Sequence, residues 1–192
     1  MNRSGSRSLS RRTFVAVASV GAGGLAGCLN RSEGTEEDPE DERETEPIEL
    51  VSHSGDEPMD TPEEYRCPVC NMQPADWQNW NAQLVHEDDG ATFFDSAGCL
   101  LNYYVDPAYY GGPDSEIAGG WVTGFDTLDL IDATEASFVL EDNHDRNDAP
   151  MDSPVPFAER ADAVAYVEKY DNLTEDDIVG FEDVDSDIAS IY

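Results

Sequence analysis

The sequence predicts an α+β fold in which two similar halves pack together. In each half, two apolar strand-like segments precede a helix that ends in tyrosine. Phe94 and Phe157 take matching places just before these two helices. Neither half is long enough to form a good core alone, so the two must share one. The sequence thus predicts one folded domain, with the cleft between its halves as the natural site.

The first half is expected to span residues 61–110. Its apolar lead segment is 65–69, and a strand, a turn, a second strand and a helix then follow at 82–85, 88–90, 92–95 and 96–104. Because turns and amphipathic helices recur by chance, the likeness between the halves is a hypothesis of internal duplication.

The second half is expected to span residues 120–171. Its apolar lead segment is 128–131, and its strands and helix follow at 136–140, 155–157 and 160–170, with a long polar loop between the strands. Together with the first half it makes up a predicted domain at residues 61–171.

The first 27 residues have the features of an export signal. Arg11 and Arg12 precede a short apolar run at 15–25, which is too short to cross a bilayer as a permanent helix. A twin arginine before a weak apolar region resembles a Tat signal. Small residues before Cys28 resemble a lipobox, so we expect cleavage there and a lipid on Cys28. An uncleaved anchor with an incidental cysteine is the alternative. The expected location is the extracytoplasmic face of the membrane.

Acidic segments are expected on both sides of the domain. Residues 33–49 are almost entirely Glu, Asp, Thr and Pro, which cannot bury a core. We therefore expect a disordered acidic linker at 28–60. An acidic C-terminal tail at 172–192 contains few apolar residues, and we expect it to dock loosely or not at all.

The charge balance excludes several classes of partner. Acidic residues number 43 and basic residues 10, which gives a formal net charge of −33. A nucleic-acid binder needs a basic face, and this chain cannot make one. Direct docking on an anionic membrane surface is excluded for the same reason. Acids run through the folded part as well as the flanks, which favours a halophilic source in which concentrated salt screens their repulsion.

Three cysteines remain once Cys28 is set aside: Cys67, Cys70 and Cys99. An odd number does not suit a pure disulfide framework outside the cytoplasm. Four interpretations stay open. A structural zinc site lacks a second close Cys/His pair, and a thioredoxin-like redox pair lacks a helix after Cys70. A plain structural disulfide or inert buried cysteines form the third, and a soft-metal site the fourth.

The soft-metal interpretation depends on Met72. Thiolate and thioether are soft donors that select Cu(I), and Cys70 and Met72 place both on one short loop. Asn71 between them tolerates left-handed backbone, which would turn both side chains toward one ion. Cys99 near a helix N-terminus is expected to have a lowered pKa. Met151 lies on the long loop of the second half, where a core methionine is not expected.

The other polar residues suggest no catalytic site. His53, His86 and His144 are expected to be solvated or at the surface. The carboxylates are too numerous to choose a catalytic pair, and no Ser/His/Asp spacing stands out. Trp77 and Trp80 are expected to cover the core, or to shield a Cu(I) ion from water and oxidants.

Several runs of the chain resemble the NosL family, in the family's order over residues 65–170. The runs are Cys67-Pro68-Val69-Cys70-Asn71-Met72, Trp80-Asn81-Ala82-Gln83-Leu84, Phe93-Phe94-Asp95, Tyr103-Tyr104, Trp121-Val122-Thr123, Ile131-Asp132-Ala133 and Ala136-Ser137-Phe138-Val139. Members are lipid-anchored accessory proteins of nitrous oxide reductase. With the acidic composition, the resemblance points to a member of haloarchaeal type.

The resemblance carries expectations for fold and function. It implies two ββαβ-like halves, in a fold similar to the organomercurial lyase. It also implies a monomeric Cu(I) chaperone that supplies the reductase's copper centres. Cys70 and Met72 fall on the Cys-x-Met pair proposed to hold copper, whereas the family often has glycine at Asn71. Some members have histidine at the position of Trp77, so here Cys67 or Cys99 is expected to be the third donor.

The leading hypothesis is therefore an exported, lipid-anchored metallochaperone without catalytic turnover. The main alternative is an extracytoplasmic thiol-disulfide oxidoreductase that acts through Cys67 and Cys70. A lipoprotein scaffold without metal is the third.

Overall fold

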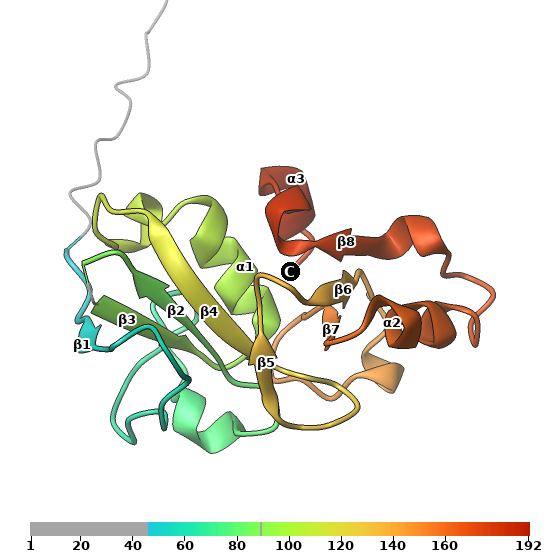
Figure 1. Cartoon of the computed structure of the whole chain (residues 1–192), viewed down its shortest axis with the longest axis horizontal. Coiled ribbons are helices and arrows are strands. Elements are labelled where there is room, and N and C mark those ends of the chain that lie inside the picture. The colour runs from blue at the N-terminus through green and yellow to red at the C-terminus, as the bar shows by residue number, and fades with distance from the viewer. Residues whose placement is uncertain (1–45, 89) are drawn as a thin grey trace, which may run out of the picture. The chain divides into compact units, whose positions relative to one another are not determined.

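Two antiparallel sheets organise the residues that the structure describes (Figure 1). The structure is a computed structural model, and it describes residues 46–88 and 90–192. The larger sheet has the order β1-β3-β2-β4-β5, with strands at Val51–Ser52, Gly90–Phe94, Ala82–His86, Ile117–Thr123 and Leu130–Asp132. The smaller sheet has the order β7-β6-β8, with strands at Val155–Phe157, Ser137–Val139 and Ile178–Gly180. The α+β prediction is confirmed.

The helices are short. The α-helices are α1 (Ala97–Val105), α2 (Arg160–Val167) and α3 (Ser186–Ala189). The 3-10 turns are η1 (Pro74–Trp77), η2 (Ala108–Tyr110), η3 (His144–Arg146), η4 (Glu175–Asp177) and η5 (Phe181–Asp183). The two helices that the sequence predicts, near 96–104 and 160–170, are present as α1 and α2 with slightly different ends. None of the described helices combines the length and apolarity that crossing a bilayer requires.

The two sheets share one pattern of connections. β2, β3, α1 and β4 follow one another, and β2 pairs with both β3 and β4. β6, β7, α2 and β8 repeat this order, and β6 pairs with both β7 and β8. Phe94 pairs with the first residue of β2, and Phe157 with the first residue of β6. Each half therefore has a ββαβ connection, while common descent of the halves stays a prediction.

The strands β2 and β3 are buried on both faces. Leu84 and Phe94 belong to the main core cluster, in which Leu100 and Leu101 of α1 pack. On the other face, Phe93 contacts Tyr65 edge to face, with 5.2 Å between ring centroids. A strand with apolar residues on both faces needs a cover on each side, and α1 and the segment before β2 provide them.

The domain begins earlier than the sequence suggested. Residues 46–60 were expected to belong to the acidic linker, but Val51 pairs with Ala91 as β1 joins the edge of the larger sheet. His53, expected to be solvated, is only 5% exposed. It packs against Trp121 and its Nε2 lies 3.2 Å from the Gln83 side-chain oxygen. The rest of the linker and the signal segment, including Arg11, Arg12 and Cys28, lie outside the described residues.

The C-terminal segment is part of the core, so the expected loose tail at 172–192 is wrong. Ile178 in β8 pairs with Val139. Phe181 lies 4.1 Å from Tyr104 between ring centroids, and α3 contacts α1. The acidic composition gave the wrong expectation because most of the few apolar residues, such as Ile178, Phe181 and Val184, are buried. With β8 included, the second half extends beyond residue 171.

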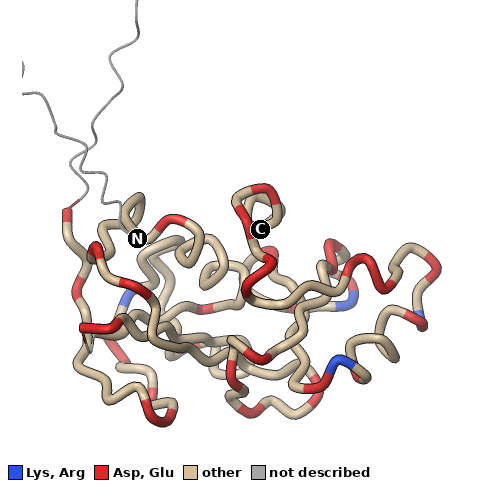
Figure 2. Tube along the Cα trace, turned by 45° about the horizontal axis from the view of Figure 1, so that its top comes forward, with Lys and Arg blue, Asp and Glu red and all other residues tan. Residues whose placement is uncertain are grey.

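Acidic residues are spread over the described surface, as Figure 2 shows. The described basic residues are Arg66, Arg146, Arg160 and Lys169. Acids lie on loops and helices of both halves and form no single acidic region. This distribution agrees with a solvation role for the charge.

Candidate metal centre

Three thiols and one carboxylate meet at the start of α1. The ligand atoms of Cys67, Cys70, Cys99 and Asp95 all lie within 4.8 Å of one another. We call these four residues the thiol cluster. Cys67, Cys99 and Asp95 are buried, and Cys70 is half-buried at the outer side. All three cysteines are free thiols.

A tight loop presents two of the thiols. The Cys67 amide donates to the Met72 carbonyl at 2.9 Å, and the Asn71 amide donates to the Cys67 carbonyl at 2.9 Å. Asn71 closes the turn with φ of 64°, in the left-handed region that the sequence predicted for it. Tyr65 fixes the start of the loop, because its ring packs on Phe93 and its hydroxyl donates to the Glu49 carbonyl.

The end of β3 and the first turn of α1 present the other two ligands. Asp95 directly follows β3, and Ser96 caps the helix by accepting from the Cys99 amide at 3.2 Å. Gly98 leaves no room for a Cβ, because the Asp152 carbonyl lies against it. Its amide donates to the Ser153 hydroxyl at 3.2 Å. The loop that carries Met151 is thereby held against the helix, one residue from Cys99.

The three thiols of the cluster have pKa values that are shifted in different directions. Hydrogen bonds from Cys67 and then Cys99 lower the pKa of Cys70, and the Met72 amide adds to this effect. The hydrogen bond to Cys70 raises the pKa of Cys67. Hydrogen bonds to Cys67 and Cys70, together with burial, raise the pKa of Cys99. Cys70 therefore has the lowest pKa of the three thiols and is the first to lose its proton. The lowered pKa expected for Cys99 is wrong, because its role as donor to the other sulfurs outweighs the helix N-terminus.

Asp95 is an isolated buried acid. It is 0% exposed, and its Oδ1 lies 2.8 Å from Cys70 Sγ. Its Oδ2 has no hydrogen-bond partner within the described part of the chain. Burial, followed by the contact with Cys70, raises the pKa of Asp95 to about 6. Cys70 Sγ donates to Asp95 Oδ1, and Asp95 Oδ2 remains an unfilled acceptor beside it.

The two methionines that were predicted as copper ligands lie on different parts of the chain. Met72 is half-buried on the Cys67–Met72 loop, two residues after Cys70. Met151 packs against the same core cluster that includes Cys67 and Cys99. Whether either thioether serves as a ligand stays a prediction.

The histidines are not gathered around the cluster. His86, expected at the surface, is 0% exposed and bonds the Tyr103 hydroxyl at 2.9 Å. Burial lowers the pKa of His86. His144 is exposed as expected, and it forms an ion pair with Asp152.

Asp95 was not predicted as a ligand from the sequence. Its position between a strand and a capping serine was the available signal, but 43 acids obscured it.

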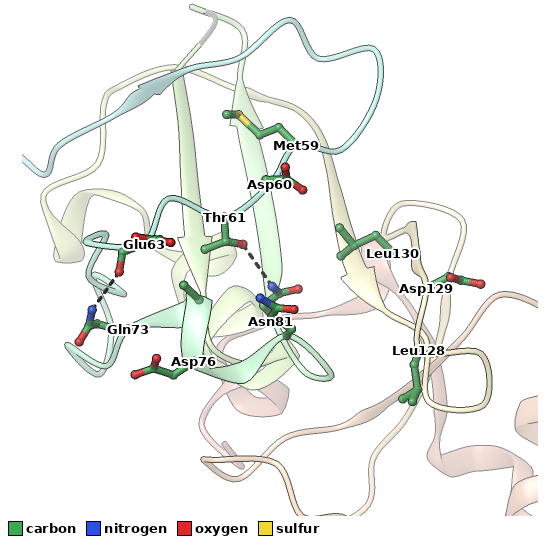
Figure 3. A pocket seen from close by; sticks show the side chains of 12 residues that line it. Met59, Asp60, Thr61, Glu63, Gln73, Asp76, Asn81, Leu128, Asp129 and Leu130 are labelled. Carbon is green, nitrogen blue, oxygen red and sulfur yellow. Dashed lines mark hydrogen bonds between the residues drawn. The ribbon is translucent and has the colours of Figure 1, made fainter.

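The two tryptophans follow the thiol-bearing loop in the sequence. Trp77 and Trp80 are half-buried, and Trp80 lies 6.3 Å from Phe125 between ring centroids. Figure 3 shows a pocket of about 870 Å³ that is lined by neither tryptophan. Its lining includes Asp60, Glu63, Asp76, Asn81 and Leu128, and it contains no cysteine. This pocket is separate from the thiol cluster.

Comparisons with known proteins agree with the arrangement. The sequence profile of the NosL family matches residues 58–189. The fold is similar to the crystal structure of the copper chaperone NosL from Shewanella denitrificans, with a TM-score of 0.51 and 16% identity. The match covers 68% of this chain and 97% of the other. No curated protein matches the chain. Because the family profile covers more than half of the sequence, this chain belongs to the NosL family.

Proposed function

We propose that the protein is an exported Cu(I) chaperone that binds copper at the thiol cluster. The convergence of three free thiols within 4.8 Å, two from the Cys-x-x-Cys-x-Met loop and one from α1, carries this proposal. Thiolate and thioether are the donors that Cu(I) selects. Cys70 is the principal ligand, Met72 the second, and Cys67 or Cys99 the third. Met151, which packs against the core cluster that includes Cys67 and Cys99, is a further donor in this proposal.

Copper is cargo in this proposal, and the exposure of the thiols suggests how it is passed on. Cys70 is half-buried at the outer side, while Cys67 and Cys99 lie beneath it. A soft ligand of the recipient approaches from the Cys70 side and replaces one sulfur at a time. Because each step exchanges one sulfur for another, the ion is never free in water.

We infer the recipient from the family resemblance, and the cellular setting from the N-terminal sequence and the acidic composition. The copper serves the assembly of the nitrous oxide reductase copper centres in denitrification. The chain is exported by Tat through Arg11 and Arg12, and a lipid on Cys28 anchors it to the extracytoplasmic face of the membrane. It acts as a monomer, in a halophilic cell of haloarchaeal type. Replacing both arginines with lysine should leave precursor in the cytoplasm, and Cys28→Ser should release the protein from the membrane.

A competition titration with a Cu(I) chelator on the reduced full chain tests copper binding. Cys70→Ser should lower the affinity by about 100-fold or more, because it removes the charged soft donor. Met72→Leu should lower it by about tenfold, since a thioether is neutral. His144→Ala is the matched control, since this exposed side chain lies outside the cluster. Unchanged affinity after joint replacement of Cys67, Cys70 and Cys99 would refute the proposal.

The same preparation tests the oxidoreductase alternative. The lowered pKa of Cys70 beside Cys67 is the observation that favours it. Cys67 is 2% exposed, which a resolving thiol tolerates because it attacks the mixed disulfide from within the chain, so a functional test must separate the two candidates. A chain that fails to bind Cu(I) but cycles Cys67 and Cys70 against a dithiol would establish the alternative.

A further inference from the structure

We propose that a pocket lined by Trp77 and Trp80 binds an arginine side chain of the protein that receives the copper. The pocket has a volume of about 470 Å³, within the range of about 300–1,000 Å³ that is typical of ligand sites. Asp76 and Asp148 also line it, and we call it the tryptophan pocket. The choice of partner rests on the proposed copper function, whereas the arginine-binding chemistry does not.

One turn of the chain brings the two tryptophans to the same pocket. The Trp77 carbonyl accepts from the Trp80 and Asn81 amides, each at 2.8 Å, so the chain folds back within four residues. Trp80 is also positioned by Phe125, with 6.3 Å between the ring centroids. Because both tryptophans are half-buried, part of each remains accessible to a ligand.

Asp148 is supplied by the second half of the domain. It follows Asn147, which is 6% exposed and whose side chain donates to the Ser153 carbonyl at 2.8 Å. The Ser153 hydroxyl in turn accepts from the Gly98 amide in α1. The loop that carries Asp148 is thus held in place by α1.

The groups that line the tryptophan pocket favour a guanidinium group. A cation is attracted to the face of an indole ring within about 6 Å, and arginine stacks on such a ring while its planar fork binds carboxylates. None of the described basic residues lines the pocket, and within the described part of the chain Asp76 and Asp148 pair with no base. The second half contains the same combination of groups, since Arg146 lies 3.8 Å from the Tyr170 ring centroid and 3.0 Å from Glu141.

Short-range chemistry is needed for recognition, because acids are spread over the described surface (Figure 2). In salt of about 1 M the Debye length is about 3 Å, so the net charge of −33 cannot select a partner from a distance. Indole rings beside carboxylates act only on a group in direct contact with them. Tryptophan and arginine are also among the residues that contribute most to binding at protein interfaces.

The place of the pocket along the chain indicates the copper recipient as the partner. Trp77 comes five residues after Met72, on the segment that continues from the thiol-bearing loop. Asp148 comes three residues before Met151. Both methionines are proposed copper ligands, so an arginine in the tryptophan pocket would dock its protein on the two segments that carry them.

Nuclear magnetic resonance of the indole N–H groups in the reduced full chain tests the pocket. The probe is a blocked Gly-Arg-Gly peptide, and the control is the same peptide with citrulline, which has the shape of arginine without its charge. The arginine peptide should shift the Trp77 and Trp80 signals saturably. The signal of Trp121, which packs on His53 outside the pocket, should not move. Equal shifts with the citrulline peptide, or no shift of Trp77 and Trp80, would overturn the proposal.

Matched carboxylate variants test whether the pocket or the net charge binds the peptide. Asp148→Asn should weaken binding about threefold, since an exposed ion pair contributes little, and Trp77→Leu about fivefold or more. Asp145→Asn removes an exposed carboxylate outside the pocket and should leave binding unchanged. Circular dichroism verifies each fold, and Asp148→Asn carries the test if Trp77→Leu does not fold. Equal weakening by Asp145→Asn and Asp148→Asn would contradict a specific site.

Copper transfer tests the identity of the partner. The double variant Asp76→Asn/Asp148→Asn should keep its Cu(I) affinity within about twofold, but transfer Cu(I) to copper-free nitrous oxide reductase and its assembly proteins about tenfold more slowly. An unchanged transfer rate would contradict the recipient as the partner. Shifts of Trp77 and Trp80 on concentrating the chain alone would show that a second copy fills the pocket, which would also overturn that choice. Peptide binding by a chain that does not bind Cu(I) would refute the proposed function and support the arginine site.

Discussion

Among the described residues, each half of the domain buries one carboxylate, and the two differ in their hydrogen-bond partners. Glu141, in the second half, accepts from Arg146 at 3.0 Å, from the Tyr166 hydroxyl at 3.1 Å and from the Asn143 amide at 3.0 Å. Asp95, in the first half, contacts Cys70 and keeps one oxygen without a partner. Removing a partner from a satisfied buried carboxylate is strongly destabilising, whereas a carboxylate buried without a counter-ion already carries an uncompensated desolvation cost.

The starts of the two helices differ in the same way. At matching places after Phe94 and Phe157, the first half has Asp95 and Ser96, and the second has Ala158 and Glu159. Ser96 caps α1 with its side chain, while α2 has no side-chain cap. The same connection of strands and helix thus carries ligands in one half only. This contrast shows that the same connection of strands and helix forms without a thiol cluster at its helix start.

The largest expected effect is on the stability of the second half. Arg146→Ala leaves Glu141 buried without its cation, which should lower the free energy of unfolding by about 3 kcal/mol. Asp95→Asn in the metal-free chain should change it by less than about 1 kcal/mol or raise it, because no counter-ion is lost. Urea unfolding of both variants measures the difference. If Asp95→Asn lowered the free energy of unfolding as much as Arg146→Ala does, the contrast between the halves would be refuted.

Salt should have a smaller and more general effect. Surface carboxylates repel one another less in multimolar salt, so the thermal midpoint should fall on dilution to about 0.1 M. The buried Glu141–Arg146 pair is screened much less than the surface charges. The stability difference between wild type and Arg146→Ala should therefore stay nearly constant across salt. A wild-type midpoint that does not depend on salt would refute the halophilic interpretation.

The smallest expected effect concerns the turn in the thiol-bearing loop. Asn71 has φ of 64°, which glycine adopts without strain and alanine does not. Asn71→Gly should change stability by less than about 1 kcal/mol, while Asn71→Ala should lower it by about 1–2 kcal/mol. Urea unfolding with Cu(I) titration checks both, and the affinity of the glycine variant should equal that of the wild type. Equal stability of the alanine and glycine variants would show that the turn is not constrained.

The sequence predicted much of the first half and less of its surroundings. Apolar segments and matching phenylalanines located the central strands and the helices α1 and α2, since these signals are local. The sequence did not show the burial of His53 or the packing of Phe181. Both residues lie in acidic segments and are buried by contacts with residues far away in the sequence. The three thiols were identified by their odd number and spacing. Asp95 could not be distinguished, because only the folded chain shows which of 43 acids lacks a partner.

Copper X-ray absorption on the reduced full chain tests the central claim most directly. The chain is loaded with one equivalent of Cu(I), beside the variant in which Cys67, Cys70 and Cys99 are serine. Sulfur donors should dominate the wild-type first shell, and the variant should lose that shell and its copper. A first shell of nitrogen and oxygen, identical in both proteins, would contradict copper binding at the thiol cluster.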